Sequence, residues 1–204
     1  MSLVIFFKVF SMCLIGAMSP GPSMVVVINN AIFKNRYHGI ITSIGHGIGI
    51  SIYAVFAVIG IGMIIKTDLI LFNSIKIVSI IFLIYMGVKS IFNKKSIDFE
   101  NKNFKGGATS FFQGFAISIL NPKIFIWFIA IYSQFMSEKN DFLFNAYLVI
   151  TAGIVDSIWY IFLTILTTSS VSLNFVKKNN YVLNKITGYI FILIGVALFV
   201  NIYF

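Results

Sequence analysis

The feature that most constrains this chain is a series of apolar runs, each long enough to cross a lipid bilayer as a helix. About 20 helical residues cover the roughly 30 Å of hydrocarbon in a membrane. The runs lack the alternating polar and apolar residues of a membrane barrel strand, so helical spans are predicted. Only 10% of the residues are charged and 59% are hydrophobic, whereas a soluble domain carries about 25% charged residues. The sequence therefore indicates an integral membrane protein.

Six such runs predict an all-α membrane protein with six transmembrane helices. The first run lacks the basic start and small-residue cleavage site of a secretory signal, so we expect it to be retained as a helix. The predicted spans are residues 3–33, 40–65, 69–92, 109–135, 142–166 and 181–203.

Prolines interrupt the first and the fourth of these spans at membrane depth. Each proline removes a backbone donor and clashes with the preceding turn, so the freed carbonyls need partners in protein or water rather than in lipid. A helix broken at this depth indicates a site. The interrupting residues, which we take as candidate substrate-binding residues, are Ser19, Pro20, Gly21, Pro22 and Ser23 in the first span and Asn121, Pro122 and Lys123 in the fourth.

Basic residues gather between spans one and two, three and four, and five and six, whereas the alternate loops contain fewer. The positive-inside rule then places the odd-numbered loops in the cytoplasm and both termini outside. This distribution accounts for the net charge of +9, so nucleic-acid binding is not indicated.

Three spans in each half mean that the second half enters the membrane in the opposite sense to the first, which predicts two inverted three-helix repeats with broken helices one and four. Weak internal similarity supports this: the Ser-Pro break corresponds to the Asn-Pro break, and residues 82–87 resemble residues 191–195. Secondary transporters built in this way bind substrates near the midplane. The expected organisation is a repeat at 1–92, a cytoplasmic linker at 93–108 and a repeat at 109–204, all in one membrane domain.

The half-helix after each break presents unpaired N–H groups and the positive end of its dipole, which attract anions. Ser19 or Gly21 can cap the first half-helix, and Asn121 with Pro122 is a favourable N-cap and first-turn pair for the second. An amino-acid carboxylate is a natural ligand for such termini. A purely structural kink is the alternative, but two breaks in corresponding positions favour a functional site.

Asp156 is the only acidic residue near the middle of a predicted span, where an ionised carboxylate is costly unless paired, hydrated or protonated. It is suited to carry a coupled proton or to pair with a substrate ammonium. Lys123 is the only basic residue at comparable depth, so a structural Asp156–Lys123 ion pair is a competing interpretation. His46 and Gln113 are further candidates for lining a polar path, although a single histidine among glycines is more often a packing residue.

Other chemistries find little support in the composition. Cys13 is the only cysteine, which excludes an internal disulfide. Two histidines and no clustered carboxylates predict no metal site, and without a nucleophile and base near the midplane we expect neither enzyme activity nor a cofactor. The small residues of span two, Gly45 and Gly49 among them, predict close helix packing.

Several motifs occur along nearly the whole chain: Gly-Ala-Met-Ser-Pro-Gly-Pro at 16–22, the basic turn with Gly39 and the glycine-rich second span, Tyr-Met-Gly at 85–87, Gln-Gly-Phe at 113–115 and Asn-Pro-Lys at 121–123. Together they resemble the LysE/RhtB family of amino-acid efflux proteins. The resemblance implies export of amino acids or close derivatives from a bacterial cytoplasm, driven by a proton or other ion gradient. It also implies that both breaks belong to the central site and that Asp156 matches a polar position in the family's fifth span.

We therefore expect a secondary transporter in the bacterial cytoplasmic membrane that exports amino acids in exchange for protons or another coupling ion. Neutral substrates are favoured, because Asp156 already serves the α-ammonium and leaves no second carboxylate for a basic side chain. The expected partners are the substrate, the ion and the lipid bilayer, and a homo-oligomer is compatible with the sequence. An exporter of a metal or other cation, or a non-transporting membrane protein, are the alternatives.

Overall fold

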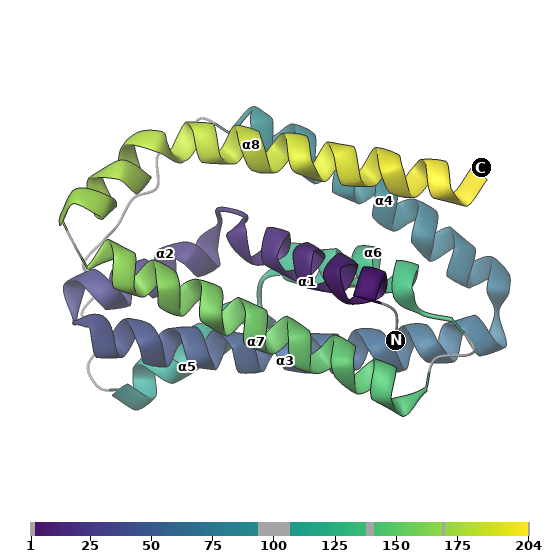
Figure 1. Cartoon of the computed structure of the whole chain (residues 1–204), viewed down its shortest axis with the longest axis horizontal. Helices are drawn as coiled ribbons and strands as arrows, with labels where there is room; N and C mark the ends of the chain where they lie inside the picture. Colours follow the sequence, from purple (N-terminus) through teal and green to yellow (C-terminus); the bar gives the residue numbers. More distant parts are fainter. Residues whose placement is uncertain (1–2, 94–106, 138–140, 169, 204) are drawn as a thin grey trace.

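The computed structural model describes residues 3–93, 107–137, 141–168 and 170–203 (Figure 1). They form α-helices, with no strand in the described ranges, which confirms the all-α prediction. The helices are α1 (Leu3–Met18), α2 (Pro22–Phe33), α3 (Arg36–Thr67), α4 (Leu69–Ile91), α5 (Gly107–Ile119), α6 (Pro122–Phe135), α7 (Phe142–Thr167) and α8 (Ser170–Tyr203).

Helices long and apolar enough to cross a membrane account for most of the chain. Among the described residues, α3, α4, α7 and the Tyr181–Val200 part of α8 each qualify as a continuous span. The pairs α1 with α2 and α5 with α6 qualify together, and they are bent by 67° and 56° at their breaks. Each pair counted as one span gives six, the number that the sequence predicts. The protein is a multi-pass membrane protein.

Both predicted breaks are present, and a proline opens the helix after each. Pro22 is the first residue of α2 and Pro122 is the first residue of α6. A proline is tolerated there because its missing N–H would have had no partner inside the helix, and its fixed φ suits the first turn.

The largest difference between the predicted loops and the structure lies before the sixth span. The stretch that contains Lys177 and Lys178, expected as a loop before the sixth span, is helical because α8 already begins at Ser170. Hydropathy marks only the part of a helix that lipid surrounds, and lysine is a good helix former in water. The predicted linker at 93–108 falls almost entirely on residues 94–106, which lie outside the described residues.

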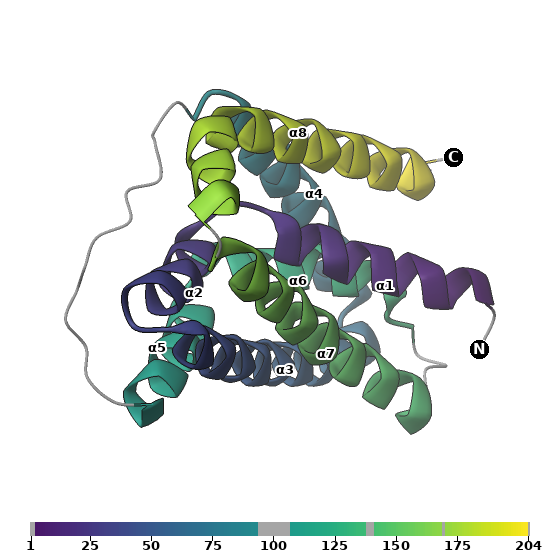
Figure 2. The ribbon, with the colours of Figure 1, turned by 60° about the vertical axis from the view of Figure 1, so that its left-hand side comes forward.

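The helices form two layers that Figures 1 and 2 show from two directions. In the larger layer α3 packs against α7, α5 packs against α3, and α1 packs against α7. The pair α4 and α8 forms the second layer, joined to the first mainly where α4 contacts α6. The contact of α3 with α5 thus has a counterpart in the contact of α7 with α1, as an inverted repeat requires. The repeat boundaries and the membrane orientation stay predictions.

Glycines allow the backbones of the larger layer to approach closely. A Cβ atom added to Gly45 of α3 would overlap the Phe111 carbonyl of α5, and one added to Gly114 of α5 would overlap the Thr42 carbonyl of α3. On another face of α3, Gly47 lies against Gly153 and Ser157 of α7. Close packing, the role that the sequence predicts for the small residues of span two, is therefore confirmed at Gly45, Gly47 and Gly49.

We expect Gly45→Ala to destabilise the protein and Gly60→Ala to leave it unchanged or slightly more stable. Both residues are in α3, but a Cβ at Gly60 has nothing within 4 Å. Overpacking at Gly45 should lower the free energy of unfolding by about 1–3 kcal/mol, whereas Gly60→Ala gains helix propensity. Thermal unfolding of the purified variants in detergent measures the difference, and equal midpoints would contradict the packing argument.

Candidate functional site

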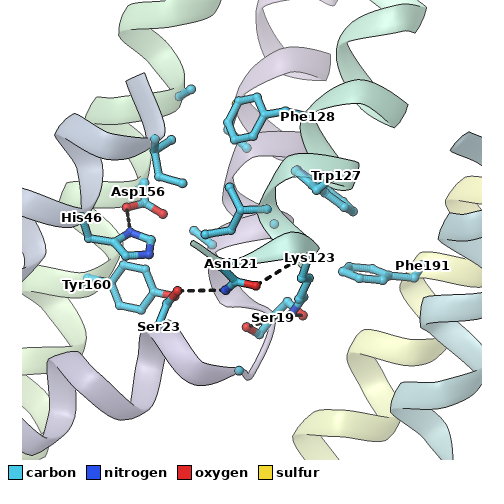
Figure 3. A pocket seen from close by; sticks show the side chains of 17 residues that line it. Ser19, Ser23, His46, Asn121, Lys123, Trp127, Phe128, Asp156, Tyr160 and Phe191 are labelled. Atoms are coloured by element: carbon cyan, nitrogen blue, oxygen red, sulfur yellow. Dashed lines mark hydrogen bonds and ion pairs between the residues drawn. The ribbon is translucent and has the colours of Figure 1, made fainter. Parts of the chain in front are cut away.

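A polar cavity lies where the two helix breaks meet (Figure 3). Its volume is about 40 Å³, which leaves room for only a few water molecules. Its lining includes most of the residues that the sequence marks as candidates: Ser19, Gly21, Ser23, His46, Asn121, Lys123 and Asp156. The cavity is lined by residues of α1, α2, α3, α6, α7 and α8 and of the two breaks.

Asn121 connects the two breaks. Its side-chain oxygen accepts a hydrogen bond from the Lys123 N–H at 3.1 Å and so caps α6. Its side-chain nitrogen donates to the Ser23 hydroxyl in the first turn of α2 at 3.2 Å. Both side chains are buried, so one amide satisfies a helix end and joins the two broken helices.

Lys123 makes a second connection, from α6 to the end of α1. Its ammonium donates to the carbonyl oxygens of Ser19 at 3.3 Å and Pro20 at 3.2 Å, and to the Ser19 hydroxyl. Those carbonyls follow the C-terminus of α1, where a cation is favourable. Lys123 therefore supplies the partners that the broken backbone requires inside a membrane.

The two half-helices differ at their N-termini. Of the two predicted caps for α2, the structure uses Gly21, which has no side chain and so forms no side-chain cap. The first turn of α2 faces the cavity through Ser23, whereas Asn121 already occupies the corresponding position of α6. An anion therefore meets less competition at α2.

His46 and Asp156 form a buried pair on the opposite side of the cavity. The Nδ1 atom of His46 lies 2.6 Å from Oδ2 of Asp156, and the two residues are 1% and 5% exposed. The His46 ring also packs edge-on against Tyr160, with ring centroids 4.8 Å apart. In the structure Asp156 is thus paired with His46 rather than with Lys123, so the competing Asp156–Lys123 ion pair is not formed.

The approach of α3 to α7 positions this pair. His46 is followed by Gly47, which lies against Gly153, and Gly153 precedes Asp156 by one helical turn. A larger residue at either glycine would push the helices apart. The sequence shows the glycines, but not which face of α3 meets which face of α7, and for this reason the pairing could not be predicted.

An apolar wall completes the cavity. Trp127 of α6 stacks on Phe191 of α8 with ring centroids 4.8 Å apart, and Ile50, Ile124 and Phe128 also line the space. Nothing in the sequence distinguishes Phe191 as a cavity-lining residue, because aromatic residues are common throughout this chain.

Gln113 lies outside the cavity lining, in a polar cluster between α2, α3 and α5. Its side-chain oxygen accepts from Asn30 at 2.8 Å and from the Lys34 ammonium at 3.5 Å. Asn30 also donates to the Thr42 hydroxyl at 2.9 Å. Partial burial lowers the pKa of the Lys34 ammonium below its ordinary value. Pro20, Pro22 and Pro122 shape the breaks and do not line the cavity.

The fold and the site together define a multi-pass membrane protein whose polar cavity lies between two broken helices. The family described as LysE type translocator matches residues 14–202, so the chain belongs to the LysE-type translocators. A membrane protein of Bacillus subtilis, "Uncharacterized membrane protein YrhP", is 30% identical over 87% of this chain and 90% of its own length.

More distant relatives carry the name of a substrate. A protein of Salmonella typhimurium named "Leucine efflux protein" is 25% identical over 57% of this chain and 56% of its own length, and the protein of that name in Salmonella typhi matches equally well. No solved structure matches the chain.

We expect the Asn121–Ser23 hydrogen bond to stabilise the junction of the two breaks. Asn121→Ala should lower the free energy of unfolding by about 1 kcal/mol through loss of the α6 cap. Ser23→Ala loses only the shared hydrogen bond. The double variant should be destabilised by less than the sum of the two single effects, because the shared hydrogen bond can be lost only once. The expected difference is about 0.6 kcal/mol.

Denaturation of the four proteins in mixed micelles gives this coupling energy. Strict additivity would show that the two side chains do not interact.

Proposed function

We propose that this protein exports a neutral amino acid from the bacterial cytoplasm in exchange for protons, by alternating access across the cytoplasmic membrane. The observation that carries the proposal is that one cavity contains both an α2 N-terminus without a side-chain cap and a buried carboxylate, Asp156. These groups complement the carboxylate and the ammonium of a zwitterion.

The carboxylate of the substrate would bind the first turn of α2. That turn begins at Gly21 and Pro22, and its N–H groups and helix dipole favour a negative charge. The Lys123 ammonium lies 3.6 Å from the position that a Cβ of Gly21 would occupy, so it adds a positive charge beside the same terminus. Because Gly21 has no side chain, a substrate carboxylate can reach the N–H groups of α2 and the Lys123 ammonium without a clash.

The ammonium would bind at Asp156, and the side chain would lie against the apolar wall of Ile50, Ile124 and Phe128. Asp156 is the only carboxylate in the lining, so a basic side chain would be buried without a partner. A neutral, apolar side chain fits this wall best. The leucine efflux proteins among the relatives support the same substrate class.

The small size of the cavity supports alternating access. A volume of about 40 Å³ cannot hold an amino acid, so the helices around it must separate to admit a substrate. The broken pairs α1 with α2 and α5 with α6 provide two bent elements, one in each predicted repeat. Rocking of one repeat against the other would open the cavity to one side at a time.

Efflux from cells preloaded with labelled leucine tests the proposal. Wild-type expression should accelerate efflux, and an uncoupler should abolish the acceleration. Asp156→Asn should reduce efflux by about tenfold or more, because a charge-assisted hydrogen bond to the ammonium contributes roughly 1.5–3 kcal/mol.

The matched control is Asp68→Asn. Asp68 caps α4 outside the cavity, and asparagine caps helices equally well, so efflux should be unchanged. Full efflux in Asp156→Asn at equal protein abundance would contradict the role of Asp156. If wild type accelerates the efflux of no amino acid, the proposed function is wrong.

A further inference from the structure

We infer that His46 and Asp156 act as one unit that binds either one proton or the ammonium of the substrate, and that this competition couples the two movements. The inference rests on the proposed function and extends it from a single carboxylate to a histidine–carboxylate pair. The sequence alone favoured a packing role for His46.

The geometry leaves one ring nitrogen of His46 available. Nδ1 is engaged with Asp156 at 2.6 Å, whereas Nε2 is buried and has no hydrogen-bond partner. Both residues line the cavity, and in Figure 3 the imidazole lies between Asp156 and Tyr160. Buried polar atoms in proteins are usually paired. An unpaired Nε2 beside a cavity therefore indicates a ligand that binds there.

The neutral form of the pair is an acceptor site. When Nδ1–H donates to the ionised Asp156, Nε2 carries a lone pair and the unit has a net charge of −1. A primary ammonium can donate one N–H to Nε2, while Asp156 stays bonded to Nδ1 on the other side of the ring and supplies the negative charge of the unit. Substrate binding would then neutralise the charge of the unit and satisfy the unpaired nitrogen.

The protonated form excludes the same ammonium. A proton on Nε2 turns this atom into a donor and brings the unit to zero net charge, so it offers the ammonium no free acceptor at the ring and no excess negative charge. Proton and ammonium are thus alternative occupants. A proton that binds from outside would displace the substrate, and its loss to the cytoplasm would restore the site for the next one.

The other polar groups of the cavity that could compete for a proton or an ammonium already have partners in the protein. The other polar or titratable side chains that line the cavity include Tyr160 on α7, Cys13 on α1, Ser19 after α1, Ser23 on α2, Asn121 at the N-cap of α6 and Lys123 on α6. Lys123 is the other cation, and its ammonium is held by Ser19 and Pro20. Asn121 and Ser23 bond to each other.

His46→Gln in proteoliposomes tests the coupling. The glutamine amide can still donate to Asp156 but takes up no proton between about pH 5 and 8. Because Oε1 of glutamine can still accept from the ammonium, the variant should exchange external labelled leucine for internal unlabelled leucine at a reduced rate, and it should lose leucine accumulation driven by a pH gradient. Its exchange should not vary with pH, whereas acidification should weaken leucine binding to wild type.

His38→Gln is the control, because His38 lies outside the cavity and bonds to Ser110. It should retain both exchange and gradient-driven accumulation.

Gradient-driven accumulation by His46→Gln would overturn the inference. A second measurement needs no variant: leucine added to purified wild-type protein in weakly buffered detergent at acidic pH should release protons, and binding without proton release would also overturn it. If wild type neither binds nor exchanges any amino acid, the proposed function itself fails, an outcome distinct from both.

Discussion

The structure depends on the rule that no backbone polar group can be left without a partner inside a membrane. Pro22 and Pro122 break two spans, so the carbonyls after α1 and the N–H groups at the start of α6 need partners. Lys123 satisfies the former and Asn121 the latter. Both partners come from α6 or its cap, so residues at the second break supply hydrogen bonds to the backbone of the first. The two breaks together line one cavity.

Close helix packing is the second requirement, and it serves the site as well as stability. Gly45 and Gly114 bring α3 against α5, and Gly47 brings α3 against α7. Because α3 is held on both sides, His46 is buried at hydrogen-bonding distance from Asp156.

The cavity combines three chemical environments within a small volume. A helix N-terminus without a side-chain cap lies at α2, a buried carboxylate and imidazole lie between α3 and α7, and an apolar wall comes from α6 and α8. This arrangement agrees with the neutral amino-acid substrate that we propose for this member of the LysE-type translocators. In this structure Asp156 bonds to His46, Asn121 bonds to Ser23 and Lys123 bonds to Ser19.

The sequence by itself determined the apolar spans, the positions of both breaks and the small residues at the close helix contacts, because each of these follows from local composition and from the limits that proline places on a helix. It could not determine that Asp156 pairs with His46, that Lys123 binds Ser19 and Pro20, or that Gln113 lies outside the cavity. Those outcomes depend on how each helix is rotated about its axis. Rotation is decided by contacts between residues far apart in the chain, which only the tertiary structure provides.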